Sequence, residues 1–327
     1  MINSRFSETA RGSEPPFLAA GSGRTNLVRT KGVTYLAAAV EGNAVAPGLE
    51  ALIEEARRIE VYGFTETELD RARRELLRRI ERSFTELDNA ESDSYMQEYT
   101  RHFLEAEAMP GIENEYELQN RFMPEISLDD VNALAESYLA ESNRVIMVSA
   151  VEKDGIEAVD ESKLRLALGR SETRSVAVYV DEITDIPILA VVPVSGRVET
   201  RAYYDDVNMT TWTLSNGVRV ILKPTDFKND ELLLSAFSPG GTYLYDESEY
   251  LSASYADSLV RESGIGELSA VAIEKNSRGR PSQLTRTSTR LKRASGVCRA
   301  SAISRRFFSS YTDISRYPVR IPRPTQT

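Results

Sequence analysis

Residues 211–222 read Thr211-Trp212-Thr213-Leu214-Ser215-Asn216-Gly217-Val218-Arg219-Val220-Ile221-Leu222 and contain the clearest structural signal of the chain. Asn216-Gly217 separates two short runs of apolar and β-branched residues. Asn-Gly between such runs is the strongest short-range signal for a β-hairpin, because both residues readily adopt the positive φ angles of a tight turn. The stretch therefore predicts two antiparallel strands, Trp212–Leu214 and Val218–Leu222.

The sequence after the hairpin predicts a further strand, a turn and a helix. The apolar run Leu232–Phe237 is typical of a strand, and Tyr250–Glu262 has the spacing of a helix. Gly240-Gly241 between them could suggest phosphate binding, but the lysine and hydroxyl of a P-loop do not follow. Because a turn needs only the backbone freedom of glycine, we interpret the pair as a turn.

Before the hairpin, residues 1–150 are expected to form strands and several helices. Turn residues at 15–16 and 21–23 precede a predicted strand at 32–40, and a second strand is predicted at 144–150. Apolar residues recur at helical spacing between the two strands. The predicted helices span 47–62, 65–89, 92–107 and 127–139. The order of strand, helices and strand is typical of an α+β sandwich in which helices cover one face of a sheet.

Two of these helices begin with a recognisable cap. Thr65 and Glu68 have the spacing of a capping box, and Ser127 stands at the same distance before Asp130. The helix that begins after Thr65 is densely charged. Its Arg and Glu residues recur at three- and four-residue spacing, which indicates a solvated face.

The distribution of charge divides the chain near Asn276. The formal net charge is −10. Residues 277–327 carry twelve of the 40 Lys and Arg residues and one of the 50 acidic residues, which gives +11 there and −21 for residues 1–276. Phosphate binding needs positive charge, so the acidic body argues against nucleic acid as a partner.

The composition excludes several classes of enzyme. One cysteine, Cys298, excludes an internal disulfide and a thiolate zinc site, and one histidine, His102, excludes a site with paired histidines. By itself the chain is therefore not expected to be a zinc-dependent or histidine-based enzyme. No apolar run approaches the roughly 18 residues of a membrane span, and the first residues lack the apolar core of a signal peptide.

Three motifs in order resemble the opening of a homology domain in the M16 zinc metallopeptidases, the pitrilysin and insulinase-like family. They are Leu214–Val220, Lys223-Pro224-Thr225 and Ser235–Thr242. Residues 1–150 are similar to most of the family's second domain. The resemblance implies α+β sandwich domains of the LuxS/MPP-like metallohydrolase type, with helices packed on an antiparallel-rich sheet. It also implies two halves that close around a peptide, with the chemistry confined to the first of four domains.

The resemblance implies a division of residues 1–276 into three parts. Residues 1–150 correspond to a second domain without its beginning, and residues 211–276 to the start of a third domain. Residues 151–210, with a short helix at 161–168, are interpreted as the linker between them, because Pro187 and Pro193 interrupt the apolar periodicity. The catalytic domain is expected before Met1.

The family's catalytic chemistry uses two histidines four residues apart on one helical face to hold zinc, with a glutamate just before the second. Alignment to the third domain places Ser254, Asp257 and Ser258 on the three motif positions. Two hydroxyls and one short carboxylate are poor zinc ligands, so we interpret this domain as an inactive copy, and a weak hard-ion site is the alternative. His102–Ala106 resembles the motif superficially, but Ala106 replaces the second histidine. We expect no catalytic residue, no metal ligand and no cofactor in this chain, with Zn²⁺ held by the intact parent.

The Arg- and Ser-rich tail, residues 277–327, has two interpretations. One is a basic arm for nucleic acid or an anionic membrane. The other, which we favour, is a shift of reading frame near Lys275-Asn276. Permitted codons for residues 277–315, read two nucleotides later, give an acidic and periodic continuation that resembles the third domain. The tail as it stands is then expected to be disordered, because it offers little apolar surface to offset chain entropy.

These interpretations predict a non-catalytic fragment of an M16-type zinc metallopeptidase that contributes part of the chamber wall and the hinge. The alternative is a non-catalytic subunit that binds peptides or pairs with a separate catalytic chain. The expected partners are a peptide substrate, the missing catalytic domain or a partner chain. The resemblance implies a bacterial parent in the periplasm or associated with the envelope.

Overall fold

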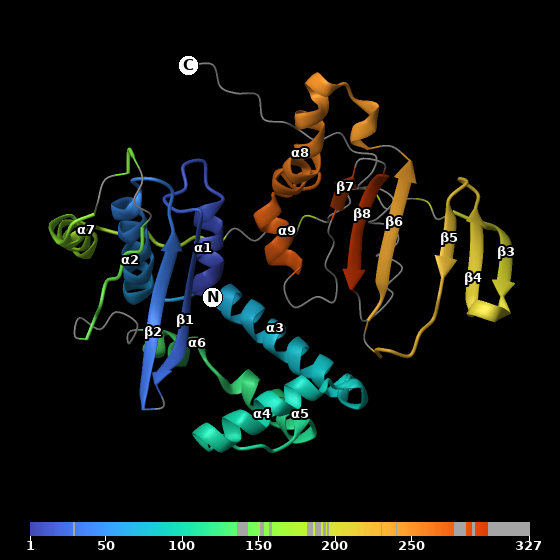
Figure 1. Ribbon diagram of the computed structural model, residues 1–327. Helices are drawn as coiled ribbons and strands as arrows, with labels where there is room; N and C mark the ends of the chain where they lie inside the picture. Colours follow the sequence, from blue (N-terminus) through green and yellow to red (C-terminus); the bar gives the residue numbers. More distant parts are fainter. Residues whose placement is uncertain are drawn as a thin grey trace. The chain divides into compact units, whose positions relative to one another are not determined.

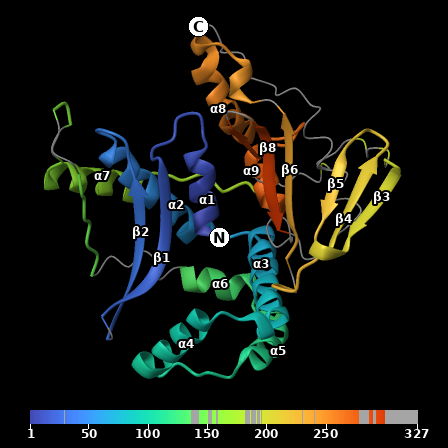
Figure 2. The ribbon, with the colours of Figure 1, turned by 45° about the vertical axis from the view of Figure 1, so that its right-hand side comes forward.

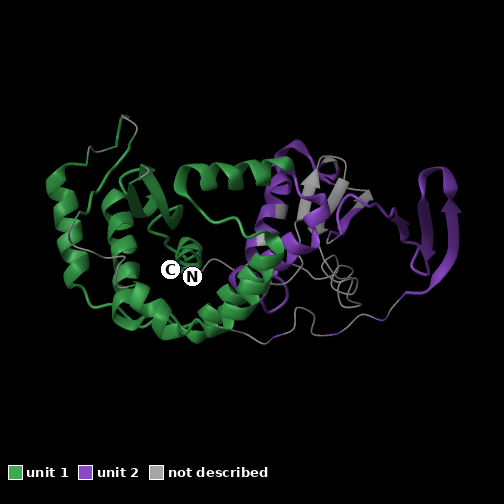
Figure 3. Cartoon of the chain, turned by 90° about the horizontal axis from the view of Figure 1, so that it is seen from below, with its two compact units in different colours: residues 1–77, 92–181 green, residues 78–91, 182–327 purple. Residues whose placement is uncertain are grey.

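The computed structural model describes residues 1–28, 30–135, 143–150, 154–156, 159–181, 186, 191, 194, 196–229, 231–239, 241–277, 286–289 and 292–299. It divides into two compact units, shown in different colours in Figure 3. Unit 1 contains residues 1–77 and 92–181, and unit 2 contains residues 78–91 and 182–327. Both units combine helices with antiparallel sheets, which confirms the predicted α+β class.

Unit 1 is built on the antiparallel pair β1 and β2, which pair from Ala19 with Ala39 to Val28 with Lys31. Helix α1 contacts β1, α2 contacts β2, and α7 packs on α2. Figure 1 and Figure 2 show the two strands side by side with α1 and α2 next to them. The elements are α1 (Ile2–Ala10), β1 (Ala19–Val28), β2 (Lys31–Ala39), α2 (Val45–Tyr62), α3 (Glu66–Thr85, whose last turns are assigned to unit 2), α4 (Ser92–Glu105), α5 (Ile112–Phe122), α6 (Leu128–Ala135) and α7 (Glu161–Thr173).

Two small apolar clusters hold unit 1 together. In the first, the rings of Phe6 and Phe17 meet edge to face with centroids 6.1 Å apart, and Leu52 of α2 packs with them. The second joins Ile59 of α2 to Phe64 and to Ala135 of α6. Burying a large apolar side chain contributes about 1.5–3 kcal/mol. The first cluster therefore holds α1 and α2 against the hairpin, and the second holds α6 on α2.

The two predicted caps are confirmed. The backbone N–H of Thr65 donates to Glu68 Oε2 at 2.9 Å, and the N–H of Glu68 donates to Thr65 Oγ1 at 3.3 Å. Ser127 and Asp130 make the same reciprocal pair at 2.9 and 3.2 Å. The hydrogen bonds from the side chain and the backbone of Ser127 lower the pKa of Asp130.

Unit 2 contains two three-stranded sheets in the orders β3-β4-β5 and β6-β8-β7. The predicted hairpin joins β4 to β5, and Gly217 has the expected positive φ of 81° while its N–H donates to the carbonyl of Leu214 at 2.8 Å. The elements are β3 (Val198–Tyr204), β4 (Met209–Leu214), β5 (Arg219–Leu222), β6 (Leu233–Pro239), α8 (Glu247–Ser263), α9 (Ala270–Ser277), β7 (Arg286–Thr289) and β8 (Lys292–Arg299). None of the helices in the described residues is long and apolar enough to cross a membrane.

The end of α8 is a tight reversal that only glycine allows. Gly264 has a φ of 85°, and a Cβ atom on it would lie 2.0 Å from the carbonyl oxygen of Leu268. Ile265 and Leu268 exchange two backbone hydrogen bonds at 2.9 and 3.0 Å across the same turn. Gly266 also has a positive φ, 61°, but a Cβ atom there would meet nothing within 4 Å.

Two sequence predictions are wrong. Residues 21–23, expected in a turn, lie inside β1, and residues 144–150, expected in a strand, are irregular although Val145 and Met147 are apolar. β-branched and apolar composition favours a strand only where a partner strand and a face to pack on are available. Within the tail, residues 286–289 and 292–299 form strands of a sheet with β6, and most of the remaining tail lies outside the described residues, so its expected disorder stays a prediction. Ladder hydrogen bonds use the backbone, so the open edge of β6 can pair with a segment of almost any composition.

Candidate functional site

A buried arginine on α1 organises the most extensive polar cluster of unit 1. The side chain of Arg5 is 1% exposed, and its Nε and Nη2 each donate a hydrogen bond of 2.7 Å to the carboxylate of Glu68 of α3. Its Nη1 donates to Glu55 of α2 at 3.1 Å, and its Nη2 also donates to the carbonyl of Gly63 at 3.1 Å. Such a planar, two-bond contact is the strongest form of an arginine–carboxylate pair. Arg5 therefore ties α1, α2 and α3 together from the inside.

The environment of Arg5 keeps it charged and keeps its aromatic neighbour neutral. Burial acts to lower the pKa of Arg5, but the hydrogen bonds and charges of Glu68 and Glu55 outweigh it and raise the pKa above its ordinary value. The ring of Tyr179 lies over the guanidinium, 4.1 Å from its carbon atom to the ring centroid. Burial, followed by the hydrogen bond to Glu8, raises the pKa of Tyr179 strongly.

Residues 174–181, which we call the strap, follow α7 and lie against this cluster. Arg71 of α3 donates to Asp181 Oδ2 at 2.7 Å, with both side chains less than a tenth exposed, and the hydroxyl of Thr67 donates to the same oxygen. Arg58 and Tyr62 of α2 donate to strap carbonyls at 2.9 and 3.2 Å. The strap is thus anchored to unit 1 at several points along its length.

Most charged residues of α3 are exposed, as the predicted solvated face requires, but two of its charges are buried in the cluster. Glu68 and Arg71 of α3 are 2% and 6% exposed. Buried charges persist only where they are paired and hydrogen-bonded, and here the partners are Arg5 and Asp181. Neither pairing could be predicted from the sequence, because the partners lie 63 and 110 residues away.

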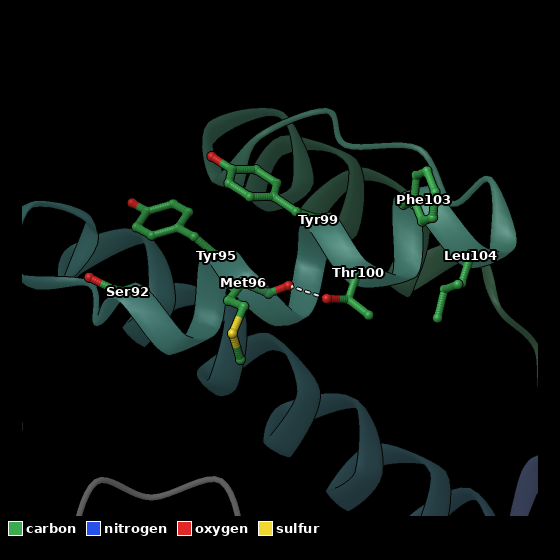
Figure 4. A pocket seen from close by; sticks show the side chains of 7 residues that line it. All are labelled: Ser92, Tyr95, Met96, Tyr99, Thr100, Phe103 and Leu104. Carbon is green, nitrogen blue, oxygen red and sulfur yellow. Dashed lines mark hydrogen bonds between the residues drawn. The ribbon is translucent and has the colours of Figure 1, made fainter.

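Helix α4 presents an apolar surface. This surface consists of five residues of the helix, which we call the α4 face, with Ser92 and Thr100 beside them: Tyr95, Met96, Tyr99, Phe103 and Leu104. These residues line an open hollow of about 610 Å³. Figure 4 shows Tyr95, Tyr99 and Phe103 projecting from one side of the helix and Met96 and Leu104 from the other.

The three aligned motif positions lie on consecutive turns of α8. Ser254 and Ser258 are half-buried, and the side chain of Asp257 lies outside the described residues. Ser254 Oγ donates to the carbonyl of Leu251 at 2.7 Å, so this hydroxyl is already engaged with the helix backbone. A zinc ion prefers imidazole, thiolate or carboxylate ligands, and two serines with one engaged hydroxyl do not fit it.

His102 stands apart from any ligand cluster. It is exposed on α4, and its Nδ1 lies 2.7 Å from the carbonyl oxygen of Glu107. Ala106, at the position where the zinc motif needs a second histidine, ends the helix with a φ of 56°. Among the described residues, no group of three or more His, Cys, Asp and Glu side chains is placed to hold a metal ion.

Comparisons with known proteins find relatives of this chain among zinc proteases. No family model matches the chain. A zinc protease described as PQQL-like from Arabidopsis thaliana is 32% identical over 210 residues, which are 64% of this chain and 22% of that protein. The probable zinc protease PqqL of Haemophilus influenzae is 24% identical over 172 residues, which are 50% of this chain and 18% of that protein. The chain thus spans about a fifth of the length of these relatives.

A solved structure has the same fold. A mutant of the ferredoxin protease FusC, in complex with Arabidopsis ferredoxin, matches with a TM-score of 0.52 and 16% identity, over 97% of this chain and 36% of that one. At this identity the likeness concerns the fold alone. Together with the identity to the PqqL-like zinc proteases, it supports the resemblance to the M16 zinc metallopeptidases. The chain is therefore similar in sequence to PqqL-like zinc proteases and in fold to FusC, as the resemblance to the M16 zinc metallopeptidases implies.

Proposed function

We propose that this chain is a non-catalytic part of an M16-type zinc metallopeptidase, and that it contributes chamber wall and the anchor of the hinge between the halves. The observation that carries the proposal is the cluster around Arg5 and the strap. Its charges pair with one another across α1, α2, α3 and the strap. A set of charges that is paired internally positions elements of the fold, and it leaves no base or nucleophile aimed at a substrate.

In this proposal the strap connects unit 1 to the hinge. Closure of two halves around a peptide requires a hinge that absorbs the motion and rigid segments that transmit it. With Asp181 held by Arg71, the residues up to 181 move with unit 1. The linker was inferred as residues 151–210. In this proposal, the part of it that can move relative to unit 1 begins after the strap. The same assignment makes 1–150 the wall and 211–276 the inactive copy.

Zinc and peptide hydrolysis belong to the intact parent in this proposal. Where zinc is bound, it activates a water molecule for attack on the peptide bond. The poor fit of Ser254 and Ser258 to zinc supports the absence of this step from the chain itself. The parent's peptide substrate and its location in a bacterial periplasm or envelope follow from the family resemblance alone, and both remain predictions.

The non-catalytic role is tested directly on the purified chain. After incubation with zinc and dialysis, we expect no stoichiometric metal by elemental analysis and no cleavage of a fluorogenic peptide library. Cleavage that a chelator abolishes, in a preparation free of other proteases, would refute the proposal.

The strap is tested by limited trypsin digestion at Arg174, whose side chain is mostly exposed. Asp181→Asn removes the partner of Arg71 and should accelerate cleavage after Arg174 several-fold, because local opening exposes the backbone to protease. Glu161→Gln is the matched control, since it removes an equal charge from an exposed pair with Arg165. Equal cleavage rates for the two variants would show that the ion pair does not hold the strap.

The tail belongs to the proposal as a segment translated out of frame. The reversal of charge sign near Asn276 supports it. Resequencing the gene through the codons for residues 274–280 and onward tests it. A shifted frame that meets an early stop, or that shows no family-like continuation, would contradict the proposal. The basic arm would then be the remaining interpretation of the tail.

A subunit that works beside a separate catalytic chain is the second candidate, and the exposed α4 face favours it. The DNA upstream of Met1 separates the two candidates. An upstream frame that encodes a catalytic M16 domain and runs toward this chain supports a fragment, whereas an independent promoter and start support a subunit.

A further inference from the structure

The α4 face is too exposed to be part of the core of unit 1. Phe103 is 84% exposed, Met96 59% and Tyr99 58%. Single exposed apolar residues are ordinary on protein surfaces, but a contiguous apolar patch with polar surroundings marks an interaction site. Five such residues on three turns of one helix, lining one hollow, form a patch of this kind.

The charges around the α4 face select the type of partner. Residues 92–125 carry eight carboxylates and two arginines. Asp93, Glu98 and Glu105 belong to the same helix as the α4 face, and the two glutamates are seven residues apart. A second copy of the chain docked here would bring like charges together, which costs free energy at an interface. A positively charged partner would instead be attracted to these carboxylates, which favours binding.

We propose that the α4 face binds a basic amphipathic helix of a partner protein. The apolar side of that helix fills the hollow between Tyr95 and Leu104, and its Lys or Arg residues meet Glu98 and Glu105. The face from Ser92 to Leu104 rises by about 18 Å, which matches three turns of a partner helix. Anchors at positions i, i+3 or i+4 and i+7 are the usual contacts of a helix in such a groove.

This inference stands without the proposed function. It requires no zinc, no peptide hydrolysis and no assignment of the chain as fragment or subunit. Failure to bind a basic helix would leave the non-catalytic role intact, and chelator-sensitive cleavage would leave the α4 face intact. Each experiment therefore refutes only one of the two proposals.

Binding is measured by fluorescence anisotropy on the full chain with three labelled peptides of equal length. The first is a helical Leu/Lys peptide with a single apolar side. The second has Glu in place of every Lys, and the third has Ser in place of every Leu. We expect the first to bind at least about tenfold more tightly than the other two, and to weaken with added salt because exposed charges are screened.

Substitutions locate the site. Phe103→Ser and Tyr99→Ser should each weaken the Leu/Lys peptide about tenfold or more, because exposed aromatic residues are frequent binding hot spots. Neither side chain is buried, so folding is retained. Phe227→Ser is the matched control, since Phe227 is 79% exposed in unit 2, and it should leave the affinity unchanged. Glu98→Lys with Glu105→Lys should shift the preference toward the Leu/Glu peptide.

Four results would overturn the proposal. They are no binding of the Leu/Lys peptide, equal binding of the Leu/Glu peptide, affinity unaffected by Phe103→Ser, and loss equal to that of the Phe227→Ser control. Concentration-dependent self-association that Phe103→Ser abolishes would assign the face to a second copy. Binding to phosphatidylcholine vesicles in preference to the peptide, lost in the same variant, would assign it to a lipid surface.

Discussion

Replacement of Arg5 by Met tests whether the buried cluster holds unit 1 together. Met keeps much of the volume and removes the charge, so packing is changed little while Glu68 and Glu55 lose their shared partner. Glu68 is left with the backbone N–H and hydroxyl of Thr65 as its nearest donors, and its side chain is 1% exposed. Glu55 retains its ion pair with Arg58.

The expected cost follows from which charges remain buried. Breaking a buried ion pair by removing one partner costs about 3–5 kcal/mol, because the remaining charge is left without compensation. A pair of opposite charges 4 Å apart interacts by about 4 kcal/mol at an effective dielectric constant of 20, which agrees with this range. Against a total stability of about 5–15 kcal/mol, Arg5→Met should cost unit 1 a large share of its stability.

The assay is urea unfolding followed by circular dichroism at 222 nm, with Trp212 fluorescence recorded in parallel. Trp212 is the single tryptophan and lies on β4 of unit 2, so its transition is an internal reference. Arg165→Ala, which removes one partner of an exposed pair, should change stability by less than about 1 kcal/mol.

A double variant separates the charge effect from packing. Arg5→Met combined with Glu68→Gln should be less destabilised than the sum of the two single variants, by about 1–3 kcal/mol, because the second change removes the orphaned charge. Loss of less than about 1 kcal/mol in Arg5→Met, strictly additive single variants, or an equal shift of the Trp212 transition would refute the reasoning.

Two further predictions concern the turn after α8 and the pH dependence of unit 1. Gly264→Ala should destabilise unit 2 well beyond the roughly 1–2 kcal/mol of a left-handed alanine, because its Cβ meets a backbone carbonyl. Gly266→Ala should cost only the backbone strain, because its Cβ meets nothing. Thermal unfolding followed by Trp212 fluorescence compares the two variants, and equal effects would exclude the clash. The raised pKa of Tyr179 means that the folded state holds this proton more tightly than the unfolded state does. Its contribution to stability is complete below about pH 10 and declines above it, so the wild type should lose more stability than Tyr179→Phe between about pH 9 and 11. Parallel curves for the two proteins would show that Tyr179 titrates normally.

Local signals in the sequence were sufficient for many of the elements. The hairpin at Asn216-Gly217, the capping box at Thr65 and the helical spacing of α2 were all predicted and are confirmed. Each depends on residues within about four positions of one another, so the physics that decides them is contained in a short window. Helix α1 carries no comparable signal and was not predicted.

The functional features depend on contacts that no short window contains. Arg5 meets Glu68 across 63 residues, and Arg71 meets Asp181 across 110. In the sequence these charges are indistinguishable from solvated ones, because a charge is stable on a surface without a partner and in the interior only with one. The apolar spacing of α4 likewise predicts a helix with one apolar side but not whether that side is covered. Local propensity thus determined where the helices and the hairpin form, and only the tertiary structure decided which charges are buried and which apolar face remains open.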